Sequence, residues 1–134
     1  MSPLPVSEEP TPERRPGIGM PAALLLDEFG SVLTDAFDAT PYHVGSSAVG
    51  KVWRDVDVRL ILDDERYAAE YGDPEHPHQS PRWVAMVRAF AALGREMTRL
   101  PIDFQIDQQS RANAKHHGVR SALGIHTYFR RKGK

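Results

Sequence analysis

The sequence contains no cysteine. That absence excludes a disulfide framework, a cysteine nucleophile and a zinc site built from thiolates. The chain also lacks any apolar run approaching the roughly 18 residues that suggest a membrane span. Its first residues, MSPLPVSEEPTPERRP, have neither the basic start nor the apolar stretch of a secretory signal. We therefore expect a cytoplasmic protein that has no membrane partner.

Acidic residues are missing from the last part of the chain, although the net charge of the whole sequence is only -1. Seven of the 17 basic residues and none of the 18 acidic residues follow Asp107. The residues up to Asp107 therefore have a net charge of -8, and the basic C-terminal segment 108–134 has +7. Such a segment favours either a polyanionic partner or a solvated terminus that aids solubility. The sequence leaves both interpretations open.

The length of 134 residues suits one domain and leaves little room for a second. Residues 1–20 contain five prolines, which remove backbone donors and oppose both helix and central strand. We expect a flexible leader over 1–20 and a single domain over 21–134, ending in the basic segment 108–134.

Apolar spacing along the chain predicts both helices and strands. Spacing of three and four predicts helices over 22–37 and from Pro81 onward, with Ser80 as N-cap of the second. Alternation predicts strands over 42–44, 52–62 and 101–106, and the polar stretch 63–80 suggests a short helix followed by a loop. The predicted fold class is therefore α/β (α+β), with a small mixed β-sheet flanked by helices.

Two of the predicted strands carry acidic residues on the face opposite their apolar residues. Asp55 and Asp57 project to the same side because strand side chains alternate, and Asp103 has the same context in a later strand. Half-buried carboxylates are costly unless a cation neutralises them, and Mg²⁺ prefers such hard oxygen ligands. Three carboxylates that meet could hold two ions about 3.5–4 Å apart.

The small-residue loop after the first strand predicts phosphate binding. Glycine at position 45 allows a phosphate to approach the backbone closely, and Ser46 and Ser47 offer hydroxyl donors. Lys51 and Arg54 could add charge-assisted hydrogen bonds to a triphosphate. We expect Gly45, Ser46, Ser47, Lys51 and Arg54 to bind nucleotide.

The stretch HVGSSAVGKVWRDVDVRLIL resembles the signature of the DNA polymerase beta-type nucleotidyltransferase superfamily. That signature is an apolar residue, Gly-Ser, a spacer, and then Asp-apolar-Asp-apolar. The form Gly-Ser-x-Ala-x-Gly is especially similar to the minimal nucleotidyltransferases. The resemblance covers about residues 22–107 and implies the nucleotidyltransferase fold. It also implies that Asp55 and Asp57 are catalytic metal ligands, that Asp103 is the third carboxylate, and that Gly45 and Ser46 hold triphosphate.

The sequence departs from the family pattern at three points. The spacer between Ser46 and Asp55 has only eight residues. Val49 stands where the minimal enzymes often have arginine, and Arg59 stands where an apolar residue is common. Because Arg59 shares a strand face with the acids, it could bind a phosphate of the nucleotide or pair with Asp57 in place of a metal.

The resemblance implies a magnesium-dependent nucleotidyltransferase with two bound Mg²⁺ ions. Its substrate would be an NTP such as ATP, and it would move an NMP to a hydroxyl of a protein or RNA acceptor. Two alternatives stay open. One is a catalytically inactive binding or regulatory subunit of the same fold, which an Arg59–Asp57 pair would favour. The other is a small RNA-binding protein that uses residues 111–134.

Overall fold

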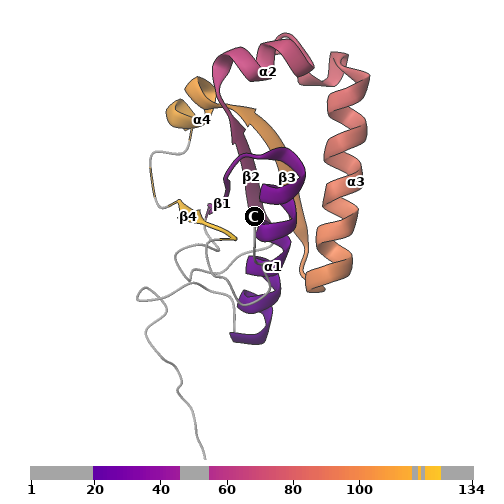
Figure 1. Cartoon of the computed structure of the whole chain (residues 1–134), viewed down its shortest axis with the longest axis vertical. Coiled ribbons are helices and arrows are strands. Elements are labelled where there is room, and N and C mark those ends of the chain that lie inside the picture. Colours follow the sequence, from indigo (N-terminus) through magenta and orange to yellow (C-terminus); the bar gives the residue numbers. More distant parts are fainter. Residues whose placement is uncertain (1–19, 46–54, 116–117, 119, 125–134) are drawn as a thin grey trace, which may run out of the picture.

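The computed structural model describes residues 20–45, 55–115, 118 and 120–124 (Figure 1). This part of the chain contains both helices and strands, as the apolar spacing predicts. In chain order the elements are α1 (Met20–Phe37), β1 (Pro41–Val44), β2 (Val56–Leu62), α2 (Asp64–Tyr71), the 3₁₀ turn η3 (Pro77–Gln79), α3 (Pro81–Thr98), β3 (Ile102–Gln108), α4 (Gln109–Lys115) and β4 (Ser121–Ala122).

The four strands form one mixed sheet in the order β3-β2-β1-β4. β1 runs antiparallel to both of its neighbours, whereas β2 and β3 are parallel and are connected through α2, η3 and α3. A parallel pair needs such a crossover, because its second strand must start again at the same end of the sheet. The fold is therefore α/β with a small mixed sheet flanked by helices, as predicted.

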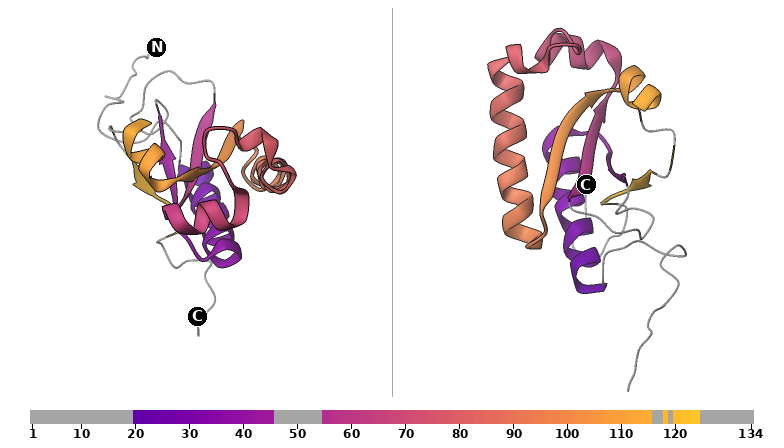
Figure 2. Two further views of the ribbon diagram at one scale, coloured as in Figure 1. Left: turned by 90° about the horizontal axis from the view of Figure 1, so that it is seen from above. Right: turned by 180° about the vertical axis from the view of Figure 1, so that it is seen from behind.

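Helices α1 and α3 cover one face of this sheet (Figure 2). Leu26, Phe29 and Leu33 recur at helical spacing along α1 and are each no more than 2% exposed. The ring of Phe29 meets the ring of Phe104 from β3 edge to face, with 6.3 Å between centroids. Every second residue of β2 and β3 joins this core, namely Val56, Val58, Leu60, Leu62, Ile102, Phe104 and Ile106.

Side chains cap the two helices that lead from β2 to β3. The Ser80 hydroxyl accepts a hydrogen bond from the backbone N–H of Trp83 at 3.2 Å, and Pro81 occupies the first turn of α3. The predicted N-cap of this helix is thus confirmed. At α2, the Asp63 carboxylate accepts from the backbone N–H of Arg66 at 2.7 Å.

Some element boundaries differ from those predicted. Helix α1 begins at Met20, which the sequence assigned to the leader, and residues 1–19 lie outside the described part. Strand β2 begins at Val56, not at position 52, and residues 46–54 are also outside the described part. Strand β3 continues to Gln108 because β2 extends far enough to pair with it there.

The apolar pattern predicts no helix or strand after residue 106. The structure forms α4 directly after β3, and β4 pairs with β1 through Tyr42 and His43. Residues 116–117, 119 and 125–134 lie outside the described part, which therefore covers only a portion of the basic segment.

Candidate functional site

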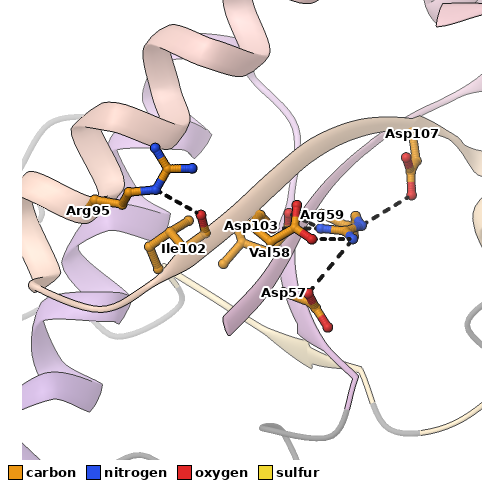
Figure 3. A network of polar contacts seen from close by, with 7 residues as sticks. All are labelled: Asp57, Val58, Arg59, Arg95, Ile102, Asp103 and Asp107. Atoms are coloured by element: carbon orange, nitrogen blue, oxygen red, sulfur yellow. Dashed lines mark hydrogen bonds and ion pairs between the residues drawn. The ribbon is translucent and has the colours of Figure 1, made fainter. Parts of the chain in front are cut away.

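Acidic side chains gather on the sheet face that α1 and α3 leave uncovered. Asp57 of β2 and Asp103 of β3 are direct partners in the register of the parallel pair. Arg59 lies two residues further along β2, and Asp107 lies four residues beyond Asp103 on β3 (Figure 3). Because side chains alternate along a strand, these four residues share one face. We call Asp57, Arg59, Asp103 and Asp107 the Arg59 cluster.

The guanidinium of Arg59 is fixed mainly by backbone carbonyls. Its Nη1 donates to the carbonyl oxygen of Asp103 at 2.7 Å and to that of Val58 at 3.1 Å. Its distances to the carboxylate oxygens are longer, at 3.9 Å for Asp57, 3.7 Å for Asp103 and 3.9 Å for Asp107. Arg59 therefore lowers the electrostatic cost of the acids without making short hydrogen bonds to their carboxylates.

Asp57 carries the perturbed carboxyl of this cluster. Burial raises its pKa above the usual value, the Arg59 guanidinium lowers it, and the negative charges of Asp103 and Asp55 raise it again. A side-chain hydrogen bond between Asp57 and Asp103 raises it further. This hydrogen bond indicates that the two carboxyl groups lie so close that ionising both of them costs electrostatic free energy. A cation bound between them would remove that cost.

Asp55 contributes charge to this site but does not complete a metal cage. It is exposed and lies directly before β2, and it acts on Asp57 electrostatically. Within the described residues, no three Asp, Glu or His side chains converge closely enough to hold one metal ion. The structure thus brings together Asp57 and Asp103 from the predicted trio. Facing carboxyl groups of this kind suit one hard divalent cation that takes its other ligands from substrate or water.

Gly45 lies against this pair, as expected of a residue at the site. Its φ of +83° falls in the left-handed region, and a Cβ at this position would overlap the Asp57 carboxylate oxygen. The φ at position 45 therefore favours glycine, and a Cβ there would have to displace the Asp57 carboxylate. The other predicted nucleotide-binding residues of this loop, Ser46, Ser47, Lys51 and Arg54, lie outside the described residues.

His43 lies on the opposite face of the sheet from the acids. It pairs with Val58 in the register, is 3% exposed, and burial lowers its pKa to about 4. The imidazole is therefore neutral at physiological pH and belongs to the core. The alternation of β1 decides this placement, because Val44 and Tyr42 take the face shared with Asp57 and Arg59.

Sequence reasoning missed Asp107 as a member of the site. Its side chain is 10% exposed, and its Oδ2 lies 3.9 Å from Nε of Arg59. The alternation of Asp103, Gln105 and Asp107 could have signalled this placement, had the predicted strand not ended at residue 106. Alternating polar residues show which face of a strand is exposed. The length of the strand, in contrast, depends on how far the neighbouring strand extends beside it.

Two described cations of the basic C-terminal segment, Arg111 and Arg120, contact groups on the domain surface. Arg111 Nη1 lies 3.9 Å from a carboxylate oxygen of Glu75. Arg120 donates to Asn113 Oδ1 at 2.9 Å, and its guanidinium carbon lies 5.5 Å from the centre of the Tyr42 ring. The remaining basic residues near the C-terminus, Arg130, Arg131, Lys132 and Lys134, lie outside the described part.

Comparisons with known proteins found no matching family model, no matching curated protein and no matching solved structure. Among the described helices, none is long and apolar enough to cross a membrane. The chemistry of this site must therefore be argued from its own residues.

Proposed function

We propose that this protein is a magnesium-dependent nucleotidyltransferase. It would move a nucleoside monophosphate from a nucleoside triphosphate to a hydroxyl group of an RNA or protein acceptor. The observation that carries the proposal is the pairing of Asp57 with Asp103 across parallel strands, with Gly45 against Asp57. The family resemblance implies a further carboxylate on a neighbouring strand, and β3 is the neighbour of β2.

The two facing carboxyl groups suit a divalent cation. Asp57 and Asp103 would hold magnesium, which would neutralise charge on the triphosphate and lower the pKa of the attacking hydroxyl. The raised pKa of Asp57 supports this assignment, because an added positive charge would favour its ionised form. The second ion implied by the resemblance also requires Asp55, and it stays a prediction.

The reaction proposed is an in-line substitution at the α-phosphorus. The acceptor oxygen forms a bond to that phosphorus while the bond to the oxygen shared with the β-phosphate breaks, and pyrophosphate leaves. Asp103, whose side chain is 40% exposed, accepts the proton of the acceptor hydroxyl and passes it to solvent. Gly45 leaves room for the Asp57 carboxylate beside the turn.

Arg59 acts in this proposal as a positioning residue. Its side chain is 11% exposed and donates to the backbone carbonyls of Val58 and Asp103, which fixes the two strands beside the acids. A guanidinium held in this way is less suited to follow a phosphate than an exposed one. We therefore assign Arg59 to the support of the carboxylates, whereas the sequence suggested that it binds nucleotide.

The test is calorimetric titration of magnesium-ATP into the wild type, Asp57→Asn and Glu96→Gln. Glu96 is an exposed acid of α3 and serves as the control for loss of one negative charge. We expect the wild type and Glu96→Gln to bind and Asp57→Asn to lose binding. Equal binding by all three proteins would contradict the assignment. A second assay with α-labelled NTP, magnesium and a cell lysate then asks whether label enters RNA or protein.

One observation favours a second function, that of a catalytically inactive subunit of the same fold. Arg59 lies within 4.0 Å of three carboxylates, and a cation of the protein itself could make a metal unnecessary. Under this alternative, magnesium-ATP would not bind the wild type, and Arg59→Gln would not create a site. Absence of heat in the wild-type titration would therefore favour the inactive subunit over the enzyme.

A further inference from the structure

A cavity of about 520 Å³ lies between α3 and β3, next to the Arg59 cluster. Asp103, Phe104 and Gln105 form its wall on the side of the strand. Because β3 is the edge strand of the sheet, three consecutive residues of that strand present its free edge to the cavity. We call this space the edge cavity. Its volume falls within the range of small-molecule sites.

The hydrogen bonds of β3 show which backbone groups face the edge cavity. The N–H of Val56 donates to the carbonyl of Pro101. The backbone N–H and C=O groups of every second residue from Pro101 onward therefore face β2. The backbone N–H and C=O groups of Ile102, Phe104 and Ile106 consequently face away from β2. Two α3 side chains bond this outer edge, Arg95 Nε to the carbonyl of Ile102 at 3.2 Å and Trp83 Nε1 to that of Ile106 at 2.9 Å. Phe104 lies between them.

These two bonds exclude an added β-strand as the occupant. A strand that paired with β3 would need the carbonyls of Ile102 and Ile106, which Arg95 and Trp83 already engage. Between these two carbonyls the edge presents the backbone N–H of Ile106 and, at Phe104, one donor and one acceptor, the backbone N–H and C=O. One donor and one acceptor side by side match the hydrogen-bonding edge of a planar heterocycle such as a nucleobase.

Helix α3 gives the opposite wall both apolar surface and positive charge. Val84, Arg88, Ala91 and Arg95 recur at spacings of four, three and four, which places them along one stripe of the helix facing the cavity. Neither Arg88 nor Arg95 forms an ion pair with any described acidic residue. Two such arginines on a partly apolar wall favour an anionic ligand and oppose a cationic one.

The edge cavity also reaches the site of the proposed reaction. Asp103 lines it, and Arg95 bonds the residue directly before Asp103 (Figure 3). A ligand in the cavity would therefore lie against the residue whose carboxyl group accepts the hydroxyl proton in the proposed mechanism.

We propose that the edge cavity binds the terminal nucleotide of a single-stranded nucleic acid acceptor. The base lies between Val84 of α3 and the edge at Phe104, and the phosphate contacts Arg88 and Arg95. The acceptor role rests on the proposed transferase function, whereas the binding itself does not. The acceptor is then nucleic acid and not protein.

The test is fluorescence anisotropy of a 5′-labelled single-stranded RNA hexamer, measured without magnesium or NTP. Arg88→Gln removes a charge from the cavity, and Arg99→Asn is its control. Arg99 is exposed, lies outside the cavity and has a left-handed φ of 61°, which asparagine tolerates. Val84→Trp fills the cavity without a change in charge, and Ala85→Trp adds the same ring at an exposed neighbouring position outside it.

We expect Arg88→Gln to raise the Kd about ten-fold, as for loss of one charge-assisted hydrogen bond. Val84→Trp should raise the Kd at least as much, while both controls stay within about two-fold of the wild type. Equal binding by all variants would place RNA on another surface, such as the basic C-terminal segment, and would overturn the proposal. Arg88-dependent binding of an acidic peptide without RNA binding would also overturn it.

The same measurement separates this proposal from the transferase function. If the hexamer binds in the cavity but Asp57→Asn and the wild type transfer no label, the binding site stands and the transferase function fails. If label is transferred to RNA but Val84→Trp transfers it as well as the wild type does, the edge cavity is not the acceptor site. Thermal unfolding of each variant confirms that it is folded before its Kd is compared.

Discussion

Gly45 and Asp57 are in direct contact, and the contact depends on the missing Cβ of Gly45. Gly45 directly follows β1 and has a left-handed φ of +83°. The residue before it, Val44 of β1, pairs with Asp57 of β2. A carboxylate that binds a metal, as proposed for Asp57, cannot also be covered by a side chain from the adjoining turn. The glycine therefore keeps one side of the acid open.

Substitution of Gly45 by alanine should both destabilise the protein and disturb the site. The left-handed φ alone should cost roughly 1–2 kcal/mol, and the added methyl group must displace the Asp57 carboxylate. Gly72→Ala is the matched control, because Gly72 has a φ of +88° and no atom near its missing Cβ. Urea denaturation should show a loss in both variants, whereas only Gly45→Ala should weaken magnesium-ATP binding. Equal nucleotide binding by both would contradict the contact's importance.

Removal of the Arg59 guanidinium should destabilise the protein, because the negative charges around it would then repel one another. Arg59→Gln leaves the carboxylates of Asp57, Asp103 and Asp107 without this cation, and we expect a loss of roughly 3 kcal/mol by urea denaturation. Arg66→Gln, which breaks a partly exposed pair with Glu70 at 3.0 Å, should cost at most about 1 kcal/mol.

Magnesium should restore more stability to Arg59→Gln than to the wild type, because the ion replaces the lost positive charge at the same acids. Arg59→Lys should fall between the two proteins, since lysine keeps the charge but has one nitrogen in place of three. In Arg59, Nη1 donates to both carbonyls, while Nη2 and Nε lie near the carboxylates. An Arg59→Gln variant as stable as the wild type would show that the cluster is not held by this guanidinium.

The buried imidazole of His43 should make the protein lose stability in mild acid. Its pKa falls from 6.5 to about 4 on folding. Between these two pH values the unfolded chain therefore binds a proton at His43 that the folded chain does not bind. The resulting stabilisation is present above pH 6.5 and is lost as the pH falls toward 4, by up to about 3 kcal/mol. Denaturation between pH 4 and 8 should show this slope reduced in His43→Gln, while His78→Gln, which removes an exposed histidine, keeps it.

Alanine at position 30 should destabilise the protein even though Gly30 lies inside α1. Helix propensity alone would give alanine an advantage of about 1 kcal/mol. A Cβ there, however, would overlap the Leu123 side chain and lie 2.8 Å from the backbone nitrogen of Gly124, so we expect a net loss of about 1–3 kcal/mol. Faster hydrogen exchange at the Leu123 amide, which donates to the carbonyl of Pro41 at 2.9 Å, would report the displaced segment. A stabilised Gly30→Ala would show that this packing is absent.

The comparison of Asp27 with Gly30 shows why local patterns mislead in α1. From the sequence, Gly30 is a weak point in a helix and Asp27 is a polar residue near its stripe. In the structure, the missing side chain of Gly30 leaves room for Leu123 to pack against α1. The Asp27 carboxylate accepts a hydrogen bond from the N–H of Gly124 at 2.8 Å. Both roles depend on residues more than 90 positions away. No local spacing carries that information.

The sequence by itself determined the elements up to β3 and the facing of their side chains. Alternation along 56–62 and 102–106 places the apolar residues on one face and Asp57, Arg59 and Asp103 on the other in any sheet, because the repeat of a strand is local geometry. Only the tertiary structure decided which acids meet. The parallel register pairs Asp57 with Asp103, leaves Asp55 before the strand, and brings Asp107 beside Arg59. Register follows from packing between distant segments, and the α3 crossover that sets it also forms the edge cavity.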